Sequence, residues 1–197
     1  LPLLRAECRV RLLSFITRAP LDCSAAFVFG HERVMNWGGG GYLDYGEELS
    51  LDLWRSGYAV DLFPSSEIVA GSFAIDAQGW VRVGCQRYEL LVLYGPDLCP
   101  PAVADFFRAA GAVRTGLVVV GPWTRDDRGR DCDGLGWLPP SFRRLAPDDR
   151  LLGVLLDELA RRGASRQPPL AEPYLLFGST QIGLPAPSGT CHLVDGT

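Results

Sequence analysis

The sequence of 197 residues contains no lysine, because all 19 of its basic residues are arginine. This absence excludes a lysine Schiff base and the lysine of a phosphate-binding P-loop. Histidine is nearly as scarce, since only His31 and His192 are present. A nucleophile that needs an imidazole base therefore has few partners to choose from in this chain.

Long apolar runs and an excess of positive charge are also missing. No apolar run approaches the ~20 residues that span a bilayer, and the formal net charge is −4. Neither a membrane nor a nucleic acid is therefore expected as a partner. The N-terminal residues alternate apolar side chains with arginine, unlike a signal peptide, and we predict a cytoplasmic location.

The six cysteines form no Cys-x-x-Cys pair and match no zinc-ligand spacing. We expect them to be reduced and several of them to pack as small apolar residues. The sequence predicts neither a metal nor a cofactor.

The chain divides into three predicted regions. Residues 1–23 read as a helical extension, 24–178 as an α/β domain, and 179–197 as a tail that leads into a further domain. The sequence begins without methionine and ends in CHLVDGT, which has neither a helix cap nor a polar tail. We therefore expect a piece of a longer protein.

Short apolar runs alternate with helical patterns through the central region. Residues 31–46 read as a long loop, and residues 100–111 read as a helix with proline at its start. The pairing of Asp44 with Glu47 resembles a capping box at a helix start, and residues 72–84 read as a small β-hairpin. Uniformly apolar strands separated by helices predict a parallel sheet covered on both faces, with a flavodoxin-like strand order. The predicted strands are 24–30, 58–64, 90–94, 116–121 and 174–178.

Ligands of such sheets lie beyond the carboxyl ends of the strands. Four polar or aromatic junctions therefore matter: 30–32, 64–67, 94–97 and 121–123.

Cys99 follows the strand 90–94 and is the first candidate nucleophile. A nucleophile elbow needs the reactive residue immediately after the strand, near Tyr94 to Pro96, whereas Cys99 comes later and directly precedes two prolines. A packed cysteine is the favoured interpretation. His31 and Glu32 form a second candidate acid–base pair.

The remaining polar candidates have competing structural interpretations. Ser65 and Ser66 resemble a cap more than a catalytic set, while Glu67 is a candidate ligand-facing carboxylate. Asp127, Asp131 and Asp133 miss the spacing of a calcium loop, so a solvated surface loop is favoured there.

Aromatic residues are the one suggestive excess. Such rings stack on sugars or anchor protein interfaces, but they also pack beneath long loops. The candidates for carbohydrate or partner binding are Trp37, Tyr94, Trp123 and Trp137.

Three stretches resemble the middle domain of large bacterial β-galactosidases and related glycosidase-like proteins. They read LWRSGYAVDLFPSSEI, QRYELLVLYGPDL and FFRAAGAVRTGLVVVGP, and the resemblance covers about residues 24–125. It implies a fold like that of class I glutamine amidotransferases without their catalytic cysteine and His-Glu partners. It also implies a role in building an oligomer, a trimer in the galactosidases. The hairpin at 72–84 and the loop at 124–136 depart from that pattern as insertions.

The leading hypothesis is a non-catalytic, amidotransferase-like domain of a larger glycoside hydrolase, serving oligomerisation and support of the sugar site. Its expected partners are further copies of itself, the other domains of its parent chain and a carbohydrate. The alternatives are a small hydrolase or amidotransferase that uses Cys99 or nearby carboxylates, and a carbohydrate-binding module.

Overall fold

The computed structural model describes residues 23–39, 43–110, 114–133, 136, 142–148 and 150–166. These residues belong to one compact unit, Cys23–Pro169. The predicted helical extension up to residue 22, the strand at 174–178 and the tail lie outside the described residues.

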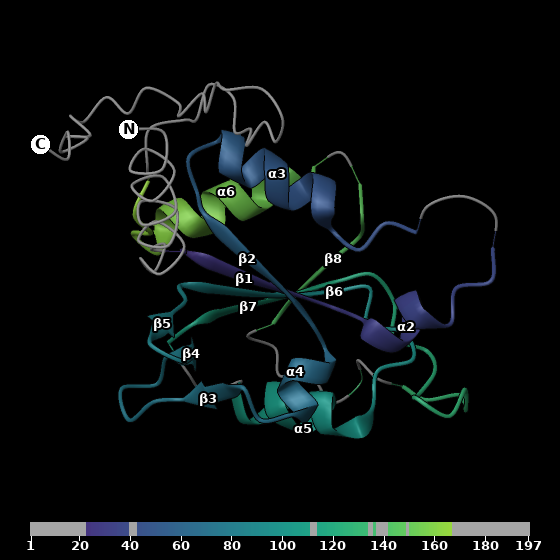
Figure 1. The fold of residues 1–197 in the computed structure, drawn as a ribbon. Helices are drawn as coiled ribbons and strands as arrows, with labels where there is room; N and C mark the ends of the chain where they lie inside the picture. Colours follow the sequence, from purple (N-terminus) through teal and green to yellow (C-terminus); the bar gives the residue numbers. More distant parts are fainter. Residues whose placement is uncertain are drawn as a thin grey trace, which may run out of the picture. The chain divides into compact units, whose positions relative to one another are not determined.

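A parallel sheet of five strands forms the centre of this unit, in the order β2-β1-β6-β7-β8 (Figure 1). Counted along the chain, the parallel strands lie in the order 2-1-3-4-5, which is the flavodoxin-like order. The predicted fold class is confirmed. The strands are β1 (Ala25–Phe29), β2 (Val60–Pro64), β6 (Leu90–Tyr94), β7 (Gly116–Val120) and β8 (Arg143–Leu145).

The central strands are apolar throughout because both faces of the sheet are covered. Every residue of β6 and of β7 is buried. Helices α3 (Glu47–Arg55) and α6 (Leu151–Arg161) cover one face, and α4 (Ser66–Val69) and α5 (Pro101–Ala110) cover the other (Figure 1). The core consequently has two halves, with Leu155 in one and Phe107 in the other. Among the described residues, no helix has the length and apolarity to cross a bilayer.

The predicted hairpin forms, and a third strand joins it. Strands β3 (Phe73–Ile75), β4 (Val81–Val83) and β5 (Gln86–Arg87) make a small antiparallel sheet. Thr115 connects it to the main sheet, because its hydroxyl oxygen accepts a hydrogen bond from the backbone of Val81 and donates one to the carbonyl of Tyr88.

Two elements contradict the sequence-based prediction. The segment after β1, predicted as a loop, begins with helix α2 (His31–Met35). The described part of the sheet also includes β8, which the sequence did not predict. β8 is a short edge strand with two exposed arginines, so it lacks the apolar pattern of a central strand.

The predicted capping box at Asp44 and Glu47 is also wrong. Glu47 is the first residue of α3, and Gly46 occupies the cap position with a φ of 92°. The Asp44 carboxylate instead accepts hydrogen bonds from the Gly46 backbone and from the Tyr94 hydroxyl. A contact to the end of β6 has therefore replaced the local cap.

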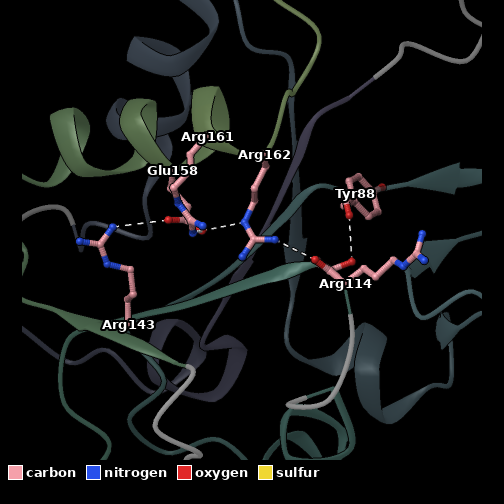
Figure 2. Close-up of polar contacts among 7 residues, drawn as sticks. Tyr88, Arg114, Arg143, Glu158, Arg161 and Arg162 are labelled. Carbon is pink, nitrogen blue, oxygen red and sulfur yellow. Dashed lines mark hydrogen bonds and ion pairs between the residues drawn. The ribbon is translucent and has the colours of Figure 1, made fainter.

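A buried carboxylate, Glu158, fastens α6 to the amino-terminal edge of the sheet (Figure 2). Its side chain is only 3% exposed and accepts hydrogen bonds from Arg161 at 2.5 Å and Arg162 at 2.6 Å. Arg143 at the start of β8 approaches it within 3.5 Å. Arg162 also donates to the carbonyl of Arg114, just before β7. One carboxylate therefore links a helix to two strands.

Burial works to raise the pKa of Glu158, but the hydrogen bonds from Arg161 and Arg162 outweigh it and hold that pKa below its ordinary value. The charged form is therefore more stable in the folded protein than in the unfolded chain. This contribution is complete above the ordinary glutamate pKa of about 4.3 and is lost as the pH falls through the lower, folded value.

We predict that Glu158→Gln lowers the free energy of unfolding by about 3 kcal/mol at neutral pH, since it leaves three clustered arginines without their counter-charge. Urea unfolding followed by circular dichroism measures the change. The difference from the wild type should shrink as the pH falls below the ordinary glutamate pKa of about 4.3, and vanish below the lower pKa of folded Glu158. Asp52→Asn is the control, because it breaks an exposed pair with Arg55 and should cost less than about 1 kcal/mol. Equal losses in the two variants would contradict the structural role of Glu158.

Candidate functional site

The topological switch point of the sheet lies between β1 and β6, since the helices that follow these two strands cover opposite faces. Ligands of doubly wound sheets bind in the crevice at this point. Three glycines, Gly30, Gly95 and Gly121, directly follow β1, β6 and β7. Their backbone N–H groups extend the sheet by one hydrogen bond each.

Glycine is required at these positions by close contact between backbones or by a left-handed backbone conformation. A Cβ on Gly30 would lie 2.3 Å from the carbonyl oxygen of Gly95, which is far inside van der Waals contact. Gly95 has a φ of 57° and Gly121 a φ of 88°, in the left-handed region that glycine adopts without strain. Two chain crossovers are therefore packed backbone to backbone at the switch point.

The guanidinium of Arg33 lies over Gly95. A Cβ at Gly95 would be 2.2 Å from Nη1 of Arg33. Arg33 lies in α2, directly after β1, and is half-buried. It therefore fills the space that a side chain at the elbow position after β6 would need.

A cavity of about 320 Å³ opens beside this arginine. Its polar lining includes Arg33, Asp44, Tyr94 and Asp97. The backbone of Gly95 and Gly121 lines it as well, and Val120, Pro122 and Pro147 supply apolar contacts.

Tyr94 and Asp44 form one side of the cavity. The Tyr94 hydroxyl donates a hydrogen bond to one oxygen of Asp44, and the other oxygen accepts the N–H of Gly46. Burial and the hydrogen bond to Asp44 raise the pKa of Tyr94 above its ordinary value, although the charge of Arg33 acts in the opposite direction. Tyr94 is therefore a neutral hydroxyl at physiological pH.

Asp97 is held by the loop after β7. One of its oxygens accepts hydrogen bonds from the backbones of Thr124 and Arg125 and from the Thr124 hydroxyl, and the other binds the Arg125 guanidinium at 2.6 Å. Burial works to raise the pKa of Asp97, but these hydrogen bonds prevail and lower it. Asp97 is therefore an ionised carboxylate with its acceptor positions already occupied.

Cys99 is 1% exposed and packs in the core beneath α5. Burial raises the pKa of its thiol to about 12, a hydrogen bond with Ser65 lowers it in part, and the charges of Glu32 and Asp97 raise it further. A thiol in this state is a poor nucleophile at neutral pH.

Ser65 connects the candidates that follow β1 and β2. Its hydroxyl oxygen accepts the backbone N–H of His31 at 2.8 Å and donates to Glu32 at 3.0 Å. Glu32 is therefore engaged by a buried serine. Glu67 accepts a hydrogen bond from Ser72 at 2.5 Å, which holds it within its own segment.

The aromatic candidates lie in different environments. Tyr94 lines the cavity, Trp123 is buried at 4% exposure, and Trp37 is 47% exposed just beyond α2. Trp137 lies outside the described residues. Of the three candidates that the structure describes, it brings Tyr94 to the switch point.

The aspartate-rich loop after β7 folds on itself. Asp126 accepts hydrogen bonds from the backbones of Arg128 and Arg130 and from the Arg130 side chain, while Asp127 and Asp131 are exposed. Within the described residues, no group of three or more His, Cys, Asp or Glu side chains is arranged to hold a metal ion.

The sequence located the edge of this site but missed its cation. The junction at 94–97 was predicted, and it contains Tyr94 and Asp97. Arg33 was missed because the segment after β1 was interpreted as a loop. Arg33 is the third residue of α2, and its guanidinium lies over Gly95 at the end of the neighbouring strand. Comparisons with protein-family models, curated proteins and solved structures found no match to this chain.

We predict that Cys99 resists alkylation in the folded chain. A pKa near 12 leaves about one thiol in 10⁵ ionised at neutral pH, and burial further blocks the reagent. Iodoacetamide labelling followed by peptide mass spectrometry measures each site. Cys85 is exposed and serves as an internal control that should react readily. Labelling of Cys99 as fast as Cys85 would contradict the packed, protonated thiol.

Proposed function

We propose that this chain is a non-catalytic, amidotransferase-like domain of a larger glycoside hydrolase, in which it serves assembly and supports the carbohydrate site. The three stretches that resemble the middle domain of bacterial β-galactosidases lie on the elements that build this sheet. The flavodoxin-like strand order is compatible with that resemblance.

The observation that carries the proposal is the crossover after β6. An elbow nucleophile belongs at the first residue after the strand, where this chain has Gly95 with a φ of 57° and the guanidinium of Arg33 over it. The backbone has the left-handed turn there, but the position bears no attacking atom.

The competing enzyme hypothesis lacks a comparable observation. Cys99 is buried with a raised pKa, and the hydroxyl of Ser65 is 0% exposed and engaged by Glu32 and the His31 backbone. Cys99 contributes to the lining of a second cavity, of about 240 Å³, but the residue is only 1% exposed.

Two exposed apolar side chains suit a role in assembly. Met35 and Trp37 are 69% and 47% exposed and follow each other closely at the end of α2. Methionine and tryptophan are enriched in protein interfaces. We place the self-association surface around these two residues.

We predict that the full chain self-associates and that the double variant Met35→Ser, Trp37→Ser raises its dissociation constant at least about tenfold, since aromatic anchors dominate interface energies. Sedimentation velocity over a concentration series measures the equilibrium. Val69→Ser is the matched control, because Val69 is also exposed, on α4, and should leave the association unchanged.

The same preparation should hydrolyse neither glutamine nor a nitrophenyl galactoside. Hydrolysis of either compound would overturn the non-catalytic assignment. A wild-type chain that stays monomeric at every concentration would overturn the assembly role.

A further inference from the structure

Arg33 is the one basic side chain that lines the cavity at the switch point, as far as the described residues show. Among the described residues, no hydrogen bond or ion pair engages the side chain of Arg33, although the guanidinium is half-buried beside Gly95. A partly desolvated cation in a concave site is stabilised by an anion that enters it.

The other polar groups of the cavity are already satisfied. Both oxygens of Asp44 accept hydrogen bonds, from Gly46 and Tyr94. Both oxygens of Asp97 are bound by the loop at 124–125. Neither carboxylate forms an ion pair or a hydrogen bond with Arg33 in the described part of the chain, although both lie on the same cavity.

We propose that this cavity binds a small organic monocarboxylate, with Arg33 as its anchor. The planar guanidinium presents parallel N–H donors that match the two oxygens of a carboxylate. Val120, Pro122 and Pro147 provide an apolar wall for the carbon skeleton. The volume of about 320 Å³ lies at the lower end of small-molecule sites, so the ligand is small.

Charge and shape favour a carboxylate over a phosphate. Asp44 and Asp97 lie on the same cavity, and a doubly charged phosphate would be repelled by both. A monoanion is attracted by Arg33 with less repulsion. A neutral sugar would leave the guanidinium uncompensated. This inference is independent of the proposed function, because it depends only on the cavity and its charges.

Isothermal titration calorimetry on the full chain tests the proposal with galacturonate, lactate, galactose and inorganic phosphate. At least one of the two carboxylates should bind, and galactose and phosphate should bind at least about tenfold more weakly. Arg33→Gln should weaken carboxylate binding about tenfold or more, as expected for the loss of a charge-assisted hydrogen bond. Arg33→Lys, which keeps the charge but not the two-donor face, should give an intermediate loss.

Arg55→Gln is the matched control, since Arg55 lies on α3 in an exposed pair with Asp52, and it should bind like the wild type. Thermal unfolding of each variant shows whether it is folded. Absence of carboxylate binding, preference for phosphate or galactose, or full binding by Arg33→Gln would each overturn the proposal.

Discussion

The contact between the carboxyl ends of β1 and β6 constrains much of this structure. Gly30 and Gly95 approach so closely that a single Cβ on Gly30 would overlap the Gly95 carbonyl. This approach lets the chain leave the two neighbouring strands in opposite directions without separating them. It also leaves the space above Gly95 open, and the Arg33 side chain occupies that space. The scaffold and the candidate site therefore depend on the same pair of glycines.

The two edges of the sheet use charge in different ways. At the amino-terminal edge, Glu158 is buried and surrounded by arginines that also reach β7 and β8. A Cβ on Gly116 would lie 2.2 Å from Nε of Arg162, so this cluster also depends on a glycine. Because the buried carboxylate of Glu158 is paired with arginines, removing either partner is destabilising, which favours a structural role for this cluster. At the carboxyl-terminal edge, Arg33 is half-buried beside an open cavity, which is the arrangement expected of a binding site.

The sequence predicted the elements whose signal is local. The strand at 90–94 matches β6 residue for residue, because a strand buried on both faces is apolar without interruption. Helix α5 begins at Pro101 and is fully described to Ala110, in agreement with the predicted proline at its start. The edge strand β8 could not be predicted in this way, since an edge strand needs no apolar pattern. The capping box failed because Asp44 is used by Tyr94, which lies 50 positions away in the sequence.

The candidate site was predictable only in part for the same reason. The parallel-sheet prediction led to the junction at 94–97, because ligands of such sheets lie at strand ends. Contacts between distant parts of the chain decide which charged side chains at this edge are already hydrogen-bonded or ion-paired. Asp97 is occupied by a loop 27 positions later in the sequence, and no local pattern indicates this pairing. Arg33 forms no ion pair with any residue that the structure describes, and the residues next to it in the sequence do not indicate this.

The loop between β6 and α5 is held in place by hydrogen bonds to the loop that follows β7. Gly95 turns the chain, and Leu98 adopts a φ of 69°, which costs a non-glycine residue about 1 kcal/mol. The hydrogen bonds from Thr124 and Arg125 to Asp97, together with the Leu98 N–H to the Arg125 carbonyl at 2.9 Å, offset that strain. This tie directs the chain so that Cys99 turns inward beneath α5. Asp97 of this loop is therefore held by the neighbouring loop, and the Cys99 thiol lies in the core. Among the described residues, the basic side chain that lines the cavity at this edge consequently comes from α2, as Arg33.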